Sequence, residues 1–254
     1  MLEIKQLSVG YADEVIVHNV DIEVPEGKVT VLFGPNGCGK STLLKSLCGI
    51  LQVKSGEVRL GGDNILSLPP KELAKKVAYL TQSRQIPDIT VRRLVLHGRF
   101  PYLSYPRHYR PEDYQKADEA LEQMGITDLA DTPLDRLSGG QRQKVYIAMA
   151  LAQDTPVILL DEPTTYLDIK HQLRTMRRVK ELAEGGKTVI MVVHDPDQAM
   201  NVADKLVLME QGKVVVQGTP EEVYQSEQLN TVFSVNLSRV KTQKGWRYFC
   251  EEEV

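Results

Sequence analysis

The spacing of hydrophobic and polar residues changes several times along the chain. Near the start, LEIKQLSV (2–9) and VIVHNVDIEV (15–24) alternate apolar and polar positions, which is typical of strands with one buried face. Short apolar runs predict further strands, and they lie at 28–33, 77–81, 157–160 and 188–193. Near the end, KLVLMEQGKVVVQG (205–218) predicts a hairpin around Gln211 and Gly212, and a strand-like tail follows it.

Apolar residues at helical spacing predict the helices. Leu43, Leu44, Leu47 and Leu51 follow this spacing just after a glycine-rich loop. Further helices are predicted at 90–97, at 111–124 with a closing glycine at 125, at 141–152, from 169 onward, and near 220–233. Because proline suits the first turn of a helix, Pro196 is expected to lie in the first turn of another one.

The order of these elements predicts an α/β core with an insertion. Residues 1–82 alternate strands with a helix, the block from 83 to about 152 carries mainly helical patterns, and strands return after 157. We therefore expect a single domain in which 1–82 and 157–254 form the α/β core and about 83–152 form a helical subdomain. A chain of 254 residues can bury a core of that size.

The loop between the strand at 28–33 and the next helix carries the first chemical signal. Residues Gly34-Pro35-Asn36-Gly37-Cys38-Gly39-Lys40-Ser41-Thr42 fit the pattern G-x-x-x-x-G-K-[ST]. In such a phosphate-binding loop the backbone amides cradle the phosphates, the lysine reaches the β- and γ-phosphates, and the hydroxyl binds Mg²⁺. These roles fall on Lys40 and Ser41. The alternative is a glycine-rich turn with a chance lysine, which requires every fixed position to match by accident.

A second glycine motif, LSGGQRQ at 137–143, leads into the helical pattern at 141–152. Glycines let backbone amides approach an anion closely, a serine hydroxyl can donate to a phosphate oxygen, and a helix N-terminus favours negative charge. Ser138, Gly139, Gly140 and Gln141 are therefore candidates for contact with a nucleotide phosphate.

Composition limits the classes of function. A net charge of −3, with acidic and basic residues interspersed, gives no sign of a nucleic-acid-binding surface. Three cysteines argue against a disulfide framework and for a reducing cytosol. One of them, Cys38, is interpreted as a small side chain that suits the loop, with a redox role as the alternative. No apolar run approaches the ~18 residues that span a bilayer, and MLEIKQLS has a strand pattern instead of a signal-peptide pattern.

With both glycine motifs present, the chain resembles the ATP-binding cassette (ABC) family over nearly its whole length. The resemblance implies an α/β P-loop NTPase fold, in which a mixed sheet with flanking helices carries an N-terminal antiparallel β-subdomain and an inserted α-helical subdomain. The segment VILLDEP (157–163) is similar to the Walker B segment of the family. There Asp161 would bind Mg²⁺, and Glu162 would polarise the attacking water as general base.

Single residues match the other family motifs. His194 matches the switch histidine, which would contact the γ-phosphate and orient Glu162, and Gln82 matches the Q-loop glutamine that senses Mg²⁺ and the γ-phosphate. Tyr11 matches the aromatic residue that stacks on adenine, with an aromatic packed at a turn as the alternative. Asp168 matches the D-loop aspartate at a dimer interface and also suits the N-cap of the helix that begins at 169, and the two roles are compatible.

The resemblance also implies partners. In this family the signature motif, which LSGGQRQ at 137–143 resembles, completes the nucleotide site of another subunit, so two ATP molecules, with Mg²⁺, lie between two chains. We therefore expect a second ATPase subunit, an identical copy of this chain, and no nucleic acid. Transmembrane permease subunits would hold the chain peripherally at the cytoplasmic face of the cell membrane, with an external substrate-binding protein. Contact with the permease is expected near residues 82–105.

Three further segments are similar to the importer branch that serves iron-siderophore, haem and cobalamin uptake, namely HGRFPY (97–102), YQKADEAL (114–121) and DEPTTYLDIKHQ (161–172). The alternative for the first is a helix ending that packs the subdomain together. A soluble ABC ATPase that acts without a permease, such as a cluster-assembly scaffold, stays open as an alternative. A small-molecule kinase or GTPase would have no use for the motif at 137–143.

Overall fold

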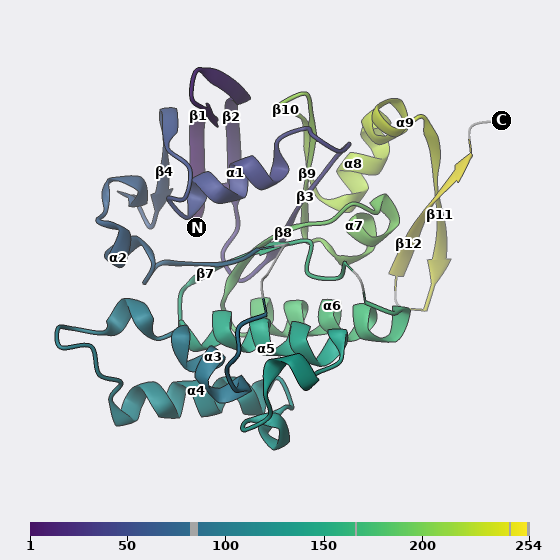
Figure 1. The fold of residues 1–254 in the computed structure, drawn as a ribbon. Coiled ribbons are helices and arrows are strands. Elements are labelled where there is room, and N and C mark those ends of the chain that lie inside the picture. The colour runs from purple at the N-terminus through teal and green to yellow at the C-terminus, as the bar shows by residue number, and fades with distance from the viewer. Residues whose placement is uncertain (82–85, 166, 244, 253–254) are drawn as a thin grey trace.

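The computed structural model describes residues 1–81, 86–165, 167–243 and 245–252. They form three sheets with helices packed around them (Figure 1). The strands are β1 Leu2–Tyr11, β2 Glu14–Val24, β3 Val29–Phe33, β4 Val53–Leu60, β5 Asp63–Asn64, β6 Val77–Leu80, β7 Val157–Asp161, β8 Thr188–Val192, β9 Lys205–Glu210, β10 Lys213–Gly218, β11 Val235–Thr242 and β12 Gly245–Glu252. The α-helices are α1 Lys40–Leu47, α2 Pro70–Leu73, α3 Val91–His97, α4 Pro111–Gln123, α5 Gly139–Ala152, α6 Ile169–Glu184, α7 Pro196–Val202, α8 Pro220–Ser226 and α9 Gln228–Phe233. Short 3₁₀ helices are η1 Ile65–Ser67, η2 Phe100–Tyr102, η3 Thr127–Leu129 and η4 Leu134–Arg136.

The largest sheet is mixed, with the strand order β10-β9-β3-β8-β7-β6. Its strands from β9 to β6 pair in parallel, whereas β10 pairs antiparallel with β9. Every residue of β3, β7 and β8 is buried, which explains the continuous apolar runs in the sequence. Because these strands are parallel, the loops that follow β3, β6, β7 and β8 all leave the sheet at the same edge.

The N-terminal sheet is antiparallel, with the order β2-β1-β4-β5. One face of β1 and β2 is buried, and Leu2, Leu7 and Ile22 on that face belong to the same apolar cluster as Leu43 and Leu44 of α1. The cluster also includes residues of β7 and β8, so α1 lies between the two sheets. The expected mixed sheet and N-terminal antiparallel β-subdomain are confirmed.

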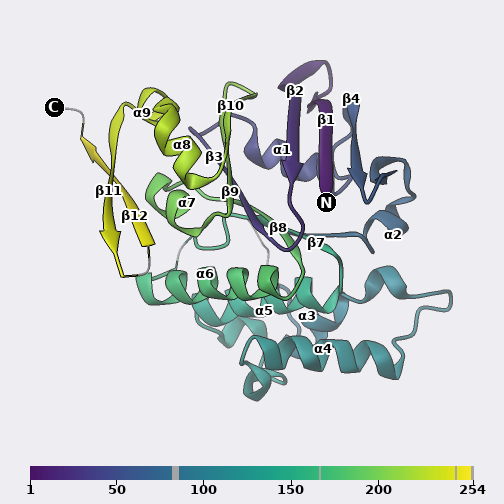
Figure 2. The same ribbon diagram turned by 180° about the vertical axis from the view of Figure 1, so that it is seen from behind.

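The helices α3, α4 and α5 pack against one another on one side of the central sheet (Figures 1 and 2). They occupy the block at about 83–152 whose patterns are helical, and their apolar faces share one core cluster with β3 and β8. Pro196 is the first residue of α7, as expected. Among the helices in the described ranges, none combines the length and hydropathy that a bilayer span requires.

The structure corrects the predicted elements in three places. Helix α1 ends at Leu47, so Leu51 lies beyond it, because the chain turns at Gly49 with φ of 73°. The single helix expected near 220–233 is two helices, since Glu227 adopts a left-handed conformation with φ of 58°. The segment 53–73 contains β4, β5, η1 and α2, which the hydrophobic pattern did not predict.

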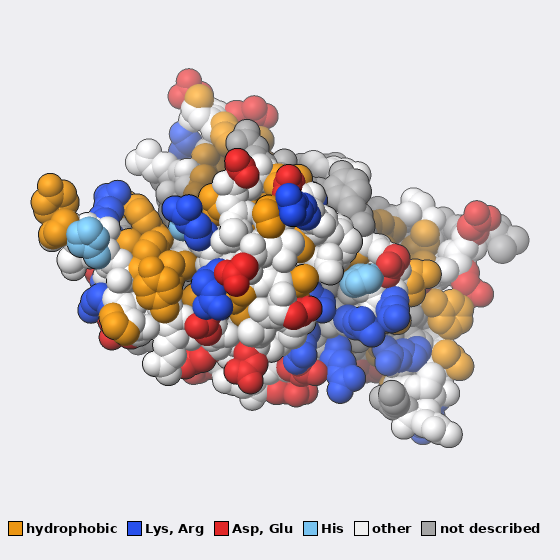
Figure 3. All heavy atoms as spheres, turned by 60° about the horizontal axis from the view of Figure 1, so that its bottom comes forward, with side chains coloured by type: hydrophobic (Ala, Val, Ile, Leu, Met, Phe, Trp, Pro, Cys, Tyr) orange, Lys and Arg blue, Asp and Glu red, His pale blue; other side chains and the backbone are white. Residues whose placement is uncertain are grey.

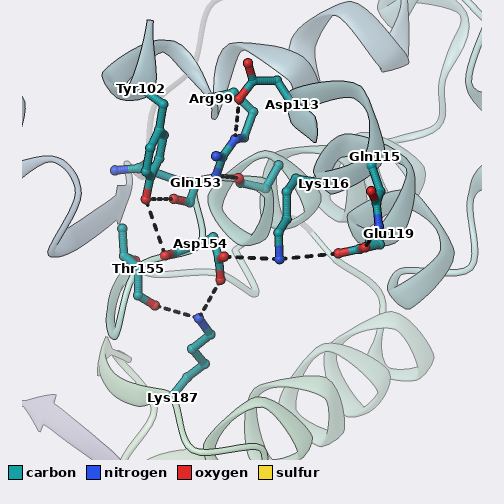
Figure 4. A network of polar contacts seen from close by, with 11 residues as sticks. Arg99, Tyr102, Asp113, Gln115, Lys116, Glu119, Gln153, Asp154, Thr155 and Lys187 are labelled. Carbon is teal, nitrogen blue, oxygen red and sulfur yellow. Dashed lines mark hydrogen bonds and ion pairs between the residues drawn. The ribbon is translucent and has the colours of Figure 1, made fainter. Parts of the chain in front are cut away.

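A buried ion pair ties α3 and α4 to the end of α5 (Figure 4). The Arg99 guanidinium donates through Nε to Asp113 Oδ1 at 3.1 Å and through Nη1 to the carbonyl of Ala152 at 3.0 Å. The hydroxyl of Tyr102 donates to the carbonyl of Gln153 at 2.9 Å. The 97–113 segment is thus anchored to the connection that leads from α5 into β7.

Asp154 extends this network to the central sheet (Figure 4). It accepts ion pairs from Lys116 of α4 at 3.2 Å and from Lys187, which precedes β8, at 3.1 Å. Partial burial acts to raise the pKa of Asp154, but the hydrogen bonds from Lys187 and Lys116 outweigh it and hold the pKa below its ordinary value. The stabilisation from this carboxylate is therefore present above its unfolded pKa and is lost as the pH falls through the lower folded value.

Candidate functional site

The loop between β3 and α1 has a conformation that depends on its glycines. Gly34 has φ of 145°, and a Cβ on it would lie 2.0 Å from the carbonyl oxygen of Met209 on β9. Gly39 caps α1 in a left-handed conformation with φ of 101°. A side chain at either position would therefore strain the backbone or displace a neighbouring strand.

Lys40 is buried in this loop. Its ammonium donates to the carbonyls of Gly34 and Pro35, at 2.8 Å each, and lies 3.5 Å from the sulfur of Cys38. These acceptors are uncharged, so an anion that enters the loop can compete for the amine with a stronger, charge-assisted bond. The cysteine side chain packs within the loop, as expected for a small residue there.

The hydroxyl of Ser41 and the carboxylate of Asp161 meet beside the phosphate-binding loop. Ser41, in the first turn of α1, donates through Oγ to Oδ1 of Asp161 at 2.9 Å, and Asp161 is the last residue of β7. The two residues are 120 positions apart in the sequence, and the parallel pairing of the central sheet brings them together.

Tyr79 on β6 is a site residue that the sequence analysis missed. Its hydroxyl donates to Oδ2 of Asp161 at 2.9 Å. Burial, together with the neighbouring Asp161 carboxylate, raises the pKa of Tyr79, so the phenol stays protonated as a donor. In the sequence, Tyr79 appears only as a tyrosine within an apolar run. Its contact with Asp161 could be recognised only from the pairing of β6 with β7.

Glu162 and His194 form the second half of the site. Glu162 follows β7 with φ of 51°, and its Oε1 contacts Nε2 of His194, which follows β8. Its Oε2 accepts a hydrogen bond from Thr165 at 3.0 Å. The Glu162 side chain is 7% exposed and that of His194 is 46% exposed, so a buried carboxylate faces a histidine that solvent can reach.

A pocket of about 190 Å³ joins these parts. Its walls come from the phosphate-binding loop and from the ends of β7 and β8, and its lining residues are Asn36, Gly37, Gly39, Lys40, Ser41, Thr42, Glu162 and His194. Ligands of open α/β sheets bind at the carboxyl ends of the parallel strands, which is where this pocket lies. The arrangement can hold a phosphate chain beside a carboxylate base.

The motif at 137–143 lies outside this pocket. Ser138 caps α5, where its Oγ accepts from the amide of Gln141 at 3.3 Å and Gln141 Oε1 accepts from the amide of Ser138 at 3.0 Å. Gly139 is the first residue of the helix, and Gly140 lines a different pocket together with His171. Within this single chain, Ser138 and Gln141 therefore bond to each other.

The remaining predicted residues have separate places. Asp168 caps α6, where it accepts from the amide of His171 at 2.9 Å, so the N-cap interpretation is confirmed. Tyr11 ends β1 and is 47% exposed, which leaves its ring available to stack. Gln82 lies outside the described residues.

A second missed residue is Gln143, in the first turns of α5. Its amide nitrogen donates to the carbonyl of Pro163, one residue after Glu162, at 2.5 Å. This bond ties the helix that carries the second glycine motif to the loop that carries the proposed base. The sequence shows Gln143 as the last residue of the second glycine motif but gives it no partner, because tertiary packing decides that contact.

The comparisons agree with this geometry. Residues 17–165 match the model of the ABC transporter family. The chain is 44% identical to the iron(3+)-hydroxamate import ATP-binding protein FhuC of Bacillus subtilis (strain 168), over 98% of this chain and 93% of that protein.

Two solved structures extend the similarity to the fold. One, described as a metal-chelate type ABC transporter in an inward-facing conformation, has a TM-score of 0.85 at 27% identity and covers 99% of this chain and 98% of that one. The other is the ATP-binding cassette MJ0796, a dimer in a post-hydrolysis state bound to ADP and phosphate. It has a TM-score of 0.74 at 31% identity and covers 87% of this chain and 99% of that one. The chain therefore belongs to the ABC transporter family, as an ATP-binding subunit that hydrolyses ATP.

Proposed function

We propose that this chain is the energy-coupling ATPase of an ABC importer for an iron-siderophore or a related metal chelate. The observation that carries the proposal is the pocket in which the phosphate-binding loop meets Glu162 and His194. The similarity to the hydroxamate import protein and to the metal-chelate type transporter supports the class of cargo. The same similarities favour transport over a soluble ATPase that acts alone.

In the proposed reaction, Lys40 holds the β- and γ-phosphates of ATP, and Glu162 accepts a proton from the water that attacks the γ-phosphorus. His194 contacts Glu162 and can orient it, while its exposed edge faces the pocket. Tyr11 is proposed to stack on the adenine. Cleavage breaks the bond between the γ-phosphorus and the bridging oxygen and leaves ADP and phosphate.

The donor set near Asp161 suits Mg²⁺. Ser41 and Asp161 offer a hydroxyl and a carboxylate, and Mg²⁺ in nucleotide sites is held by one or two such oxygens together with phosphates and waters. In the described residues no group of three or more His, Cys, Asp or Glu side chains is placed to hold a metal by itself. When bound, Mg²⁺ would neutralise developing charge on the phosphates. Gln82 is proposed as a further ligand of this ion.

Tyr79→Phe is expected to weaken Mg²⁺ binding about tenfold, because outer hydrogen bonds orient a metal-binding carboxylate. The measurement is the Mg²⁺ concentration that gives half-maximal ATPase activity at saturating ATP. Tyr109→Phe, which removes a phenol hydroxyl from the segment just before α4, serves as the matched control and should not change it. An unaltered Mg²⁺ requirement in Tyr79→Phe would show that Tyr79 does not contribute to Mg²⁺ binding.

The separate positions of the two glycine motifs support a dimer of identical subunits. Ser138, Gly139 and Gly140 do not line the pocket that contains Lys40, and we propose that they contact a nucleotide phosphate that is bound to another chain. The cassette MJ0796 is itself dimeric with ADP and phosphate bound. Gln141 and Asp168 are proposed to face the same interface. ATP binding would then close the dimer, and hydrolysis would open it.

A surface near α3 and η2 is the proposed docking site for a permease. His97, Phe100, Leu103, Arg107 and Tyr109 line a pocket of about 460 Å³ there, and Phe100 is 49% exposed. Apolar side chains gather at one end of the face in Figure 3. Contiguous exposed apolar surface marks interaction sites, and this one falls partly within the expected contact region at 82–105. Such docking would place the chain peripherally at the cytoplasmic face of the membrane.

Phe100→Ala is expected to weaken the complex with the permease at least tenfold, because a buried aromatic anchor contributes about 2 kcal/mol or more at an interface. Co-purification of the permease with the tagged variant measures this. Trp246→Ala, which removes an aromatic residue that is 46% exposed on the C-terminal hairpin, is the control. Equal recovery of the permease with both variants would place the docking site elsewhere.

The experiment that tests the proposed function is reconstitution. The chain, its permease and an external binding protein are placed in liposomes, and uptake of ferric siderophores, haem and cobalamin is measured with ATP inside. We expect ATP-dependent uptake of a ferric siderophore. ATP hydrolysis without a permease that co-purifies, and without uptake of any of these chelates, would favour the soluble ATPase instead.

A further inference from the structure

A second pocket, of about 450 Å³, lies beside the signature motif and is strongly basic. It is formed by α5, α6 and the turn that follows α4, and its lining includes Lys144, His171, Arg174, Arg177, Arg178 and Glu181. With the histidine neutral, these side chains carry three more positive charges than negative. The pocket is therefore positively charged although the whole chain carries a net charge of −3.

The cations converge because of helical spacing. His171, Arg174 and Arg178 lie three and four residues apart on α6, which places them on one face of that helix. Lys144 is one turn after Gly140 on α5, and both line the pocket from the opposite side. Basic side chains gather beside a histidine on the face shown in Figure 3.

Part of this charge is not neutralised within the chain. Arg177 and Arg178 share the carboxylate of Glu181, at 3.1 and 2.6 Å. Neither Lys144 nor Arg174 forms an ion pair with another residue in the described ranges. Cations that converge on a concave surface without a carboxylate partner attract a multivalent anion, and the guanidinium fork matches the oxygens of phosphate.

The pocket also contacts α5, the helix that begins within the signature motif. A Cβ on Gly140 would lie 2.7 Å from Cδ2 and 3.0 Å from Nε2 of the His171 ring, so the imidazole packs directly against this glycine. The ring is held from its other side, where Nδ1 lies 2.9 Å from Asp168. An anion in the pocket would therefore touch elements that carry both the signature motif and Asp168.

We propose that this pocket is a binding site for a polyphosphate anion with three or four negative charges, separate from the pocket around Lys40 in the same chain. Inorganic pyrophosphate and the diphosphate of a nucleotide share this chemistry. Binding there involves only side chains of a single chain, so it does not depend on the proposed transport function.

Equilibrium dialysis with radiolabelled pyrophosphate tests the proposal. The full-length protein is saturated with ADP, without added Mg²⁺, so that the phosphate-binding loop is occupied. We expect one pyrophosphate per chain, and about tenfold weaker binding in Lys144→Ala and in Arg174→Ala, since each removes a charge-assisted bond. Lys180→Ala removes a cation from the same helix outside this pocket, and its affinity should stay within about twofold of wild type.

Two results would overturn the proposal. One is the loss of all pyrophosphate binding on ADP saturation while labelled ADP binds at only one site per chain, which would assign the anion to the loop around Lys40. The other is the same affinity in Lys144→Ala, Arg174→Ala and Lys180→Ala, which would show nonspecific attraction. Dialysis with labelled ADP then distinguishes a nucleotide ligand from an inorganic one. If two ADP bind per wild-type chain and only one binds per Arg174→Ala chain, the ligand of the basic pocket is a nucleotide. If one ADP binds per chain in both the wild type and Arg174→Ala, and pyrophosphate still binds, the ligand is an inorganic polyphosphate.

Discussion

Glu162→Gln is expected to lower the rate of ATP hydrolysis by a factor of about 10² to 10⁴, the range that general bases contribute. Glutamine keeps the size of the side chain and can still bond to Thr165 and His194, but it cannot accept the proton of the attacking water. ATP binding should be preserved, because the proposed contact of Lys40 with the phosphates does not involve this residue. Single-turnover hydrolysis and nucleotide binding measured on the same preparation separate the two effects.

The same variant tests the dimer. Since ATP is bound but not cleaved, Glu162→Gln should accumulate as an ATP-stabilised dimer in size-exclusion chromatography, while the wild-type protein returns to monomer as ATP is consumed. Glu184→Gln, an exposed acid at the end of α6, is the control and should hydrolyse ATP at the wild-type rate. Wild-type turnover in Glu162→Gln would refute the assigned base, whereas slow turnover without a dimer would refute only the quaternary arrangement.

Arg99→Ala is expected to lower the free energy of unfolding by about 3–5 kcal/mol, the cost of leaving a buried partner charge uncompensated. Asp113 is fully buried and Arg99 is 6% exposed, so water cannot replace the lost guanidinium without opening the helical block. The variant also loses the donor to the Ala152 carbonyl and the packing of the guanidinium on the Tyr102 ring, 3.8 Å from its centroid. Urea unfolding followed by circular dichroism gives the change.

Arg110→Ala provides the comparison for this prediction. Arg110 also approaches Asp113, at 3.8 Å, but its side chain is 58% exposed, and exposed ion pairs contribute about 1 kcal/mol or less. A similar loss of stability in both variants would show that burial of the Arg99 and Asp113 pair is not the cause. Arg99 lies beside the proposed docking surface, so a loss of stability in Arg99→Ala could also impair transport. The stability of the variant is therefore measured before any test of transport.

Local patterns were sufficient for the motifs and most of the elements. The phosphate-binding loop and the carboxylates at the end of β7 follow from glycine spacing and apolar runs, which depend on neighbours in the chain, whereas the mixed sheet was implied by the resemblance to the ABC family. Two of the places where the pattern failed depend on single backbone conformations. The left-handed residue Glu227 divides one predicted helix into two, and a turn at Gly49 ends α1 before Leu51.

Contacts between residues that are distant in the sequence could be identified only from the tertiary structure. The contacts of Tyr79 with Asp161 and of Gln143 with Pro163 join residues that are 82 and 20 positions apart, and strand pairing or helix packing decides which side chains meet. The same holds for the basic pocket, where α5 and α6 bring Lys144 next to Arg174. The amino-acid order therefore specifies the chemistry of the nucleotide site, because its motifs are contiguous. The packing of helices and strands specifies which residues orient that chemistry and which cations converge beside it, because those contacts are made only when distant segments fold together.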